Sequence, residues 1–285
     1  MPRFEEQKNR IFFYPFINLD NCIPPEDEIV DQKNPFIDSD DEDTETKITL
    51  RAIDITEKIH SNWIDFFKKN IGIINELLKS LYSYAHTKNM TIYPRAEDCM
   101  NVFSMAPEKV KCVIIGEDPY PGFDKKRNLP VACGKSFASY SEERPASQIN
   151  LLNSIAKNFG PLEKPFNENY PNSLEGWTNQ GVFLLNSNIV LYKTKTEYSE
   201  IHKNLLDTYL EKRTQIWNKV SIRVCEFLSN LNKCPFILLG NKAKNLAQHV
   251  TKSFNEPHPS PKNEIVFEGK TFVQVTDNEI NWKKI

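Results

Sequence analysis

Three short runs of mostly apolar residues constrain the fold of this 285-residue chain more than any other feature. Each run ends at a small or polar residue, and stretches with helical spacing of apolar residues lie between the runs. Strands that are apolar on both faces are typical of a parallel sheet covered by helices on both sides. We therefore predict an α/β fold with strands at Val110–Ile115, Val182–Leu185 and Phe236–Leu239 and helices at Ser147–Phe159 and from about 199 to 231. Two further helices are expected between Ile48 and His86.

Charge is divided unevenly along the chain. Residues 1–47 carry 13 acidic and 5 basic residues, a net charge of −8, whereas residues 48–285 carry a net charge of +6. The first segment includes the acidic cluster Ser39–Asp43 and has little apolar periodicity, so we expect 1–47 to be a disordered tail. That tail either only solvates the chain or regulates it, and 48–285 forms the folded domain. The overall charge of −2 therefore does not exclude a nucleic acid ligand.

An aromatic island lies inside this acidic tail, at Gln7–Tyr14. Aromatic residues in a disordered segment are typical of a docking peptide. The island resembles the box by which replication and repair proteins bind the sliding clamp, because Gln7 and the pair Phe13 and Tyr14 have that spacing. Arg10, however, stands where an aliphatic residue is expected. Clamp binding and packing of the peptide on the domain are both left open.

Composition excludes several classes of protein. No apolar run approaches the 18 residues of a membrane helix, and no basic and apolar start indicates a secretory signal. The six cysteines form no CxxC pair, so we interpret them as reduced thiols of an intracellular protein. Because no Cys/His cluster has metal-ligand spacing and no Gly-rich loop cradles a phosphate, we expect neither a metal nor a cofactor.

Polar side chains follow the predicted strands, at the sheet edge where ligands of parallel α/β folds bind. The first strand leads into the loop Gly116–Gly122, in which Asp118 precedes a proline and can orient a water molecule. Such a loop alone is often only a turn. The second strand ends at Asn186, and further along the chain prolines flank His258 and restrict its backbone.

Together these motifs resemble the signatures of the uracil-DNA glycosylase family, which excises uracil from DNA. The family has a Gly-Gln-Asp-Pro-Tyr-His loop, a Leu-Leu-Leu-Asn strand end and a His-Pro-Ser-Pro-Leu loop. The resemblance spans roughly residues 60–285 and occurs in the family's order. It also includes Ile92–Pro94, Gly176–Trp177, Gln180–Val182, Ser199–Lys203, Leu238–Gly240 and Ile280–Trp282. It implies three α/β/α layers around a central, mainly parallel four-stranded sheet.

The resemblance also assigns roles to individual residues. Asp118 matches the carboxylate that holds the attacking water and faces the sugar cation, and His258 matches the group that stabilises the leaving uracil through its O2. Asn186 matches the amide that reads the Watson–Crick edge and rejects cytosine. Phe137 matches the ring on which uracil stacks, and Tyr120 matches the ring that excludes the methyl group of thymine.

DNA contacts follow from the same resemblance. The family acts on a nucleotide flipped out of the duplex, and several segments grip the phosphates. Ser147 is expected to open a helix and to bind a phosphate through its hydroxyl and the helix N-terminus. The residues matched to DNA binding are Ser147, Gly240, Asn241, Pro259, Ser260 and Lys262.

The chain departs from the family pattern at several positions. Glu117 stands among the uracil-binding residues where the family usually has Gln, and Pro121 replaces His as in poxviral relatives. Lys262 replaces the Leu that wedges into the duplex, so flipping is expected to use Ile265, Val266 or Phe267, or the enzyme favours single strands. The segment between Tyr120 and Phe137 is longer than usual and carries three basic residues, Lys125, Lys126 and Arg127. This insertion is either a plain loop or a phosphate contact.

These observations lead to one favoured function and two alternatives. We predict a monomeric, monofunctional uracil-DNA glycosylase that acts on single- or double-stranded DNA in the nucleus or another intracellular DNA-containing compartment. Binding of a DNA-mimicking acidic inhibitor is expected, and membrane binding is not. The first alternative is a catalytically reduced DNA-binding or replication accessory protein that retains the fold. The second, a glycosylase for another base, is opposed by Tyr120, Phe137 and Asn186.

Overall fold

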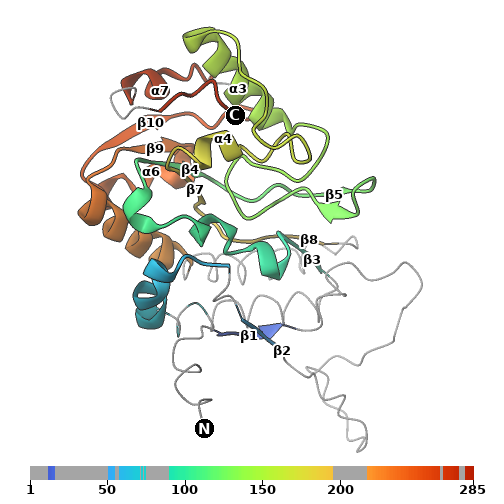
Figure 1. The fold of residues 1–285 in the computed structure, drawn as a ribbon, viewed down its shortest axis with the longest axis vertical. Coiled ribbons are helices and arrows are strands. Elements are labelled where there is room, and N and C mark those ends of the chain that lie inside the picture. Colours follow the sequence, from blue (N-terminus) through green and yellow to red (C-terminus); the bar gives the residue numbers. More distant parts are fainter. Residues whose placement is uncertain are drawn as a thin grey trace, which may run out of the picture.

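The central sheet contains four parallel strands. The computed structural model describes residues 12–16, 51–54, 58–70, 72, 74, 90–194, 217–263, 266–275 and 280–285. Within them the strand order is β10-β9-β4-β7 (Figure 1), and each neighbouring pair is parallel. The strands are β4 Cys112–Gly116, β7 Val182–Asn186, β9 Phe236–Leu239 and β10 Ser253–Glu256.

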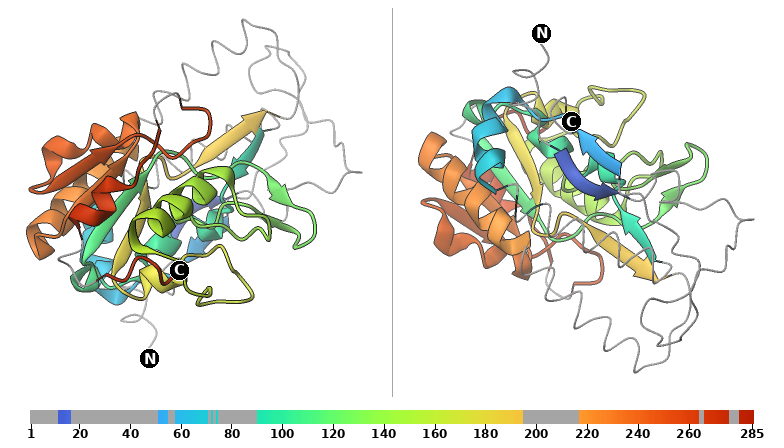
Figure 2. Two further views of the ribbon diagram at one scale, coloured as in Figure 1. Left: turned by 90° about the horizontal axis from the view of Figure 1, so that it is seen from above. Right: turned by 90° about the horizontal axis from the view of Figure 1, so that it is seen from below.

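The strands β4, β7 and β9 are buried because their side chains alternate between two apolar clusters. In β4, Val113 and Ile115 belong to one cluster, whereas Cys112 and Ile114 belong to the other. This alternation follows from the period of two residues along a strand. Both faces of the sheet are therefore covered, as Figure 2 shows from two sides.

Helices supply the outer layers. The helix α3, Ala146–Phe159, contributes Leu151, Leu152 and Ile155 to one cluster together with α7, Lys270–Gln274. The opposite cluster contains Trp63 and residues of a helical stretch at 217–232, including Val224. The predicted three-layer α/β/α fold is thereby confirmed. The remaining helical elements are α4 Glu175–Thr178, α6 Asn241–Lys244, and the 3-10 turns η3 Ser61–Trp63, η4 Ala96–Asp98, η5 Asn101–Ser104, η6 Pro107–Lys109 and η7 Ala247–His249.

Predicted and observed elements differ mainly at the edges. β10 was not predicted, because it is an edge strand of partly exposed residues and its sequence, Ser-Phe-Asn-Glu, has no continuous apolar run. The N-terminal part of the expected pair of helices is a strand, β2 Arg51–Asp54, whereas 64–70 is helical as expected. Residues 75–86 and 199–216 lie outside the described residues.

Part of the predicted disordered tail is a strand. β1, Phe12–Phe16, pairs antiparallel with β2, with Phe12 opposite Asp54 and Phe16 opposite Arg51. The expectation of disorder is therefore wrong for these five residues, because aromatic residues favour strands when a partner strand is available. Clamp binding and packing of the island on the domain both stay predictions. Gln7 and the acidic cluster lie outside the described residues.

Two small antiparallel sheets flank the central one. β3, Met90–Tyr93, pairs with β8, Leu191–Thr194, and β5, Phe123–Asp124, pairs with β6, Leu129–Pro130. The second pair forms the insertion noted above. Its turn is held by the carboxylate of Asp124, which accepts hydrogen bonds from the backbone N–H groups of Lys126 and Arg127 at 3.0 and 3.2 Å.

The described ranges contain no helix long and apolar enough to cross a membrane. Within them, no group of three or more His, Cys, Asp or Glu side chains is arranged to hold a metal ion. Five cysteines lie in this part of the chain, and all of them are buried: Cys99, Cys112, Cys133, Cys225 and Cys234.

Candidate active site

The strand register brings the predicted site residues to one edge of the sheet. Gly116, the last residue of β4, lies opposite Asn186, the last residue of β7. β9 pairs with β4 on its other side and ends at Leu239, and β10 ends two residues before His258. Because all four strands run in the same direction, the loops after them meet at their carboxyl ends.

Asp118 is held by two side chains from the neighbouring loops. One oxygen, Oδ1, accepts a hydrogen bond from Asn188 Nδ2. The other, Oδ2, lies 2.7 Å from Nζ of Lys242 in α6. The carboxylate is 29% exposed, so it is fixed in orientation but still open to a water molecule.

Glu117 and His258 both lie close to Gly240, the residue that follows β9. An ideal Cβ placed on Gly240 would lie 2.6 Å from Glu117 Oε1 and 3.0 Å from His258 Cβ, and Gly240 has a φ of +100°. The close approach and the backbone conformation both require glycine. Burial lowers the pKa of His258, the carboxylates of Glu117 and Asp118 oppose that shift, and Lys242 reinforces it. The imidazole is therefore held towards its neutral form.

Asn186 and Phe137 converge on Gly116. A Cβ on Gly116 would lie 3.0 Å from Asn186 Oδ1 and 3.1 Å from Phe137 Cε2, so a larger residue would push into both. The ring of Phe137 also lies beside that of His258, with 5.5 Å between centroids and 33° between planes. An amide, an aromatic face and an imidazole thus surround one point at the strand ends.

Phe137 adopts a backbone conformation that aromatic residues rarely use. Its φ is +59°, and it is only 5% exposed. Its carbonyl oxygen accepts hydrogen bonds from Gln148 Nε2 at 2.7 Å and from the Tyr120 hydroxyl at 3.4 Å. These contacts keep the strained residue in place, as is common at functional sites.

Tyr120 is fixed by the first turn of α3. Its hydroxyl lies 2.8 Å from Ser147 Oγ, and burial raises its pKa well above the ordinary value. Ser147 does not open the helix as expected: α3 begins at Ala146, after Pro145. The hydroxyl of Ser147 is buried against Tyr120, and its contact with a phosphate stays a prediction.

The residues matched to DNA binding lie around this site. Asn241 and Lys262 are exposed, Ser260 is partly exposed and Pro259 is buried. The Pro259 carbonyl accepts a hydrogen bond from Asn150 of α3 at 3.1 Å, which joins this loop to the helix that carries Ser147. Their contacts with DNA stay predictions.

Of the three residues expected to replace the missing wedge, the structure describes two, Val266 and Phe267. Val266 is 76% exposed. Phe267 instead packs on the core against Phe272, and Ile265 lies outside the described residues. Of the basic insertion, Lys125 and Lys126 are exposed. Arg127 lies over the ring of Tyr170, 5.1 Å from its centroid.

Two site residues, Asn188 and Lys242, were not predicted from the sequence. Asn188 is only 7% exposed, and its backbone N–H also donates to the carbonyl of Glu117 at 3.0 Å. Both lie two residues beyond a feature already selected, Asn186 or Gly240, at the same sheet edge. This closeness to a selected residue could have indicated both of them from the sequence, although neither belongs to a matched motif.

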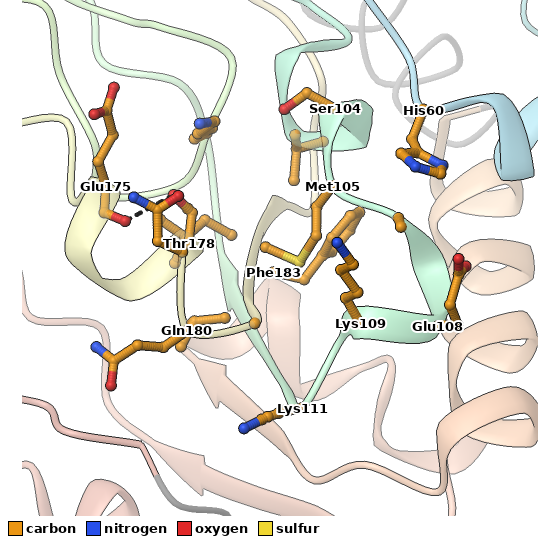
Figure 3. Close-up of a pocket in the computed structure, with 17 residues that line it drawn as sticks. His60, Ser104, Met105, Glu108, Lys109, Lys111, Glu175, Thr178, Gln180 and Phe183 are labelled. Atoms are coloured by element: carbon orange, nitrogen blue, oxygen red, sulfur yellow. Dashed lines mark hydrogen bonds between the residues drawn. The ribbon is translucent and has the colours of Figure 1, made fainter.

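A separate hollow of about 780 Å³ lies near the opposite ends of the strands (Figure 3). It is lined by Lys111 before β4 and by the first residues of β7, with Met105 and Phe183 along its wall. None of the predicted site residues lines it. Its charged groups include both lysines and glutamates, so the hollow does not favour a ligand of either charge.

Comparisons with known proteins agree with the geometry of the site. No protein-family model matches the chain. A uracil-DNA glycosylase of Mycoplasma genitalium is 30% identical over 208 residues, covering 67% of this chain and 75% of the relative. One from Fusobacterium nucleatum is 28% identical and covers 79% and 96%. Among solved structures, mimivirus uracil-DNA glycosylase is 25% identical with a TM-score of 0.58, covering 73% of this chain and 72% of that one. A mimivirus variant in complex with UGI has a TM-score of 0.56 at 26% identity.

The similarity and the site point to the same conclusion. The Mycoplasma genitalium relative is 30% identical and is covered over 75% of its length. The structure gathers Asp118, Asn186 and His258 of the predicted motifs at one edge of the sheet. This chain belongs to the uracil-DNA glycosylase family.

Proposed function

We propose that the protein hydrolyses the N-glycosidic bond of uracil in DNA, releasing free uracil and leaving an abasic site. The observation that carries this proposal is the convergence of Asp118, Asn186, Phe137 and His258 at the carboxyl ends of β4 and β7 and the loop beyond β10. These groups supply a carboxylate, an amide, an aromatic face and an imidazole around one space. The names of the relatives support the same activity.

The reaction separates two opposite charges. As the bond between the sugar C1′ and uracil N1 breaks, its electron pair leaves on uracil and positive charge develops on the sugar. Asp118 faces that cation and orients a water molecule, whose oxygen forms the new bond to C1′ while one of its protons passes to the Asp118 carboxylate. His258, held towards its neutral form, donates a hydrogen bond to uracil O2 and stabilises the negative charge there.

Base selection uses three other side chains. The carbonyl of Asn186 accepts the N3–H of uracil and its NH₂ donates to O4, whereas cytosine presents the reverse pattern and leaves buried groups unpaired. Uracil stacks on Phe137. Tyr120, fixed by its 2.8 Å hydrogen bond to Ser147, occupies the space that the methyl group of thymine would need.

An oligonucleotide assay tests this function. The full chain is incubated in EDTA with a single uracil in single- and double-stranded oligonucleotides, and alkali then cleaves any abasic site. We expect product from at least one substrate, and no product from either would refute the proposal. Asp118→Asn should lower the rate by about 10² to 10⁴ while DNA binding persists, because a general base of this kind contributes that much. Unchanged turnover would mean that Asp118 has another role.

The proposal extends to partners and location. The substrate is uracil-containing DNA, single- or double-stranded, and the protein acts as a monomer in the nucleus or another intracellular DNA-containing compartment. An acidic DNA-mimicking inhibitor is also a proposed partner, for which UGI, bound in a mimivirus structure, is a suitable probe. A sliding clamp that binds Gln7–Tyr14 stays a proposal. The accessory-protein alternative is not favoured, because Asp118, Asn186 and His258 are all present and gathered.

A further inference from the structure

Lys242 contacts two consecutive carboxylates. Its Nζ lies 2.7 Å from Asp118 Oδ2, and its backbone N–H points to Glu117 Oε1 at 3.4 Å. The contacts reach across 124 and 125 positions of sequence, from α6 to the loop after β4. They arise because β9 and β4 are neighbours in the sheet.

The carboxylate of Glu117 is confined to this region. Gly240 packs against it so closely that a Cβ there would lie 2.6 Å from Oε1 and 2.9 Å from Cδ. The same Cβ would lie 3.0 Å from His258 Cβ. Glu117 therefore shares one small region with His258 and the backbone of Lys242.

Two adjacent carboxylates repel each other, and a cation beside them offsets that repulsion. The ammonium of Lys242 contacts Asp118, whereas Glu117 faces the backbone N–H of the same residue. The side chains of Lys242 and Asp118 are 50% and 29% exposed, so water screens the ion pair in the free protein. Bound DNA would exclude part of that water and strengthen the interaction when the reaction occurs. The ion pair thus matters more to catalysis than to folding.

We propose that Lys242 is a positioning residue that balances the charge of Glu117 and holds the carboxylate of Asp118 in its reactive orientation. This inference rests on the proposed function, because Asp118 is its catalytic carboxylate. Asn188 binds Oδ1 and Lys242 binds Oδ2, so together they leave the carboxylate one orientation. Without Lys242, the carboxylate turns away from Glu117 and loses its place.

The pKa of His258 depends on the same charged groups. Burial is the largest influence on its pKa and lowers it; Glu117 and Asp118 raise it, and Lys242 lowers it. Removal of Lys242 should therefore raise the pKa of His258, and removal of the Glu117 charge should lower it again. An NMR titration of the imidazole measures this balance without any substrate.

The experiment compares Lys242→Met, Lys242→Arg, Glu117→Gln and the double variant Lys242→Met/Glu117→Gln in the full chain. We expect Lys242→Met to lower kcat about tenfold or more, which is the loss expected for a hydrogen bond to a charged group. Lys242→Arg should retain most activity. The double variant should recover much of the lost kcat. The pKa of His258, measured by NMR titration, should rise in Lys242→Met and fall back in the double variant.

Two results would overturn the inference. If Lys242→Met raises KM and weakens salt-dependent DNA binding with kcat unchanged, Lys242 is only a phosphate contact. If the losses of the single variants simply multiply in the double variant, Lys242 does not balance Glu117. Circular dichroism of each variant checks that it is folded. Failure of the wild-type protein to release uracil would instead refute the proposed function, and the titration of His258 would still test the charge balance.

Discussion

Asn188 offers a sharp test of how the protein orients its catalytic carboxylate. The side chain is 7% exposed, and Nδ2 donates to Asp118 Oδ1. The backbone N–H separately donates to the carbonyl of Glu117 at 3.0 Å. Asn188→Ala therefore removes the contact with the carboxylate and keeps the contact that positions the loop.

The size of the effect follows from the kind of bond that is lost. A hydrogen bond to a charged group contributes about 1.5–3 kcal/mol. If that bond acts on the transition state, its loss lowers kcat by about 10- to 150-fold. Because Lys242 still holds Oδ2 at 2.7 Å, we expect the lower part of this range, about 10- to 30-fold.

Folding should suffer much less than catalysis. The Oδ1 atom of Asn188 is buried and has no hydrogen-bond partner among the residues that the structure describes. Its removal relieves an unsatisfied acceptor and offsets part of the lost packing. We expect the free energy of unfolding to change by about 1 kcal/mol or less.

Single-turnover release of uracil from a single-stranded oligonucleotide measures the effect on chemistry alone. Asn158→Ala is the matched control, because within the described residues its Nδ2 donates to the carbonyls of Ser154 and Glu268, at the far end of α3. The control should react at the wild-type rate. A rate for Asn188→Ala within twofold of wild type, with the protein folded, would refute the role of Asn188 as a support for Asp118.

Three further predictions concern base selection, flipping and pH. Tyr120→Ala should permit some release of thymine, and a variant that still ignores thymine in a mismatch assay would discredit the steric gate. Val266→Ser should slow uracil release from duplex more than from single strands; equal slowing would show that the 76% exposed Val266 is not the wedge. Burial lowers the pKa of His258, so the unfolded state binds more protons below about pH 6.5. Stability should therefore fall as pH drops from 7 to 5, and the decrease should be smaller in His258→Gln by chemical denaturation.

The sequence predicts this site well where a motif lies on a strand end. The runs that became β4, β7 and β9 are continuous and apolar because these strands are buried on both faces of the sheet. Their ends could therefore be placed from the sequence. β10 was not predicted because its residues are only partly buried and its sequence has no continuous apolar run.

Contacts between loops could not be predicted in the same way. Asn188 and Asp118 are separated by 70 positions, and Lys242 and Asp118 by 124. Each pair meets only because β4 lies between β7 and β9 in a particular register. Nothing in the local pattern around Lys242 distinguishes it from an exposed lysine of a helical turn.

The helix α3 links the residues of base selection to the predicted DNA-binding loop. The first turn of this helix carries Ser147, which binds the Tyr120 hydroxyl, and Gln148, which binds the carbonyl of Phe137. One turn further, Asn150 binds the carbonyl of Pro259 in the loop that carries His258. Displacement of this turn would move the thymine gate, the stacking ring and the histidine loop together. A phosphate gripped near Ser147 would therefore act on all three, because they share one rigid support.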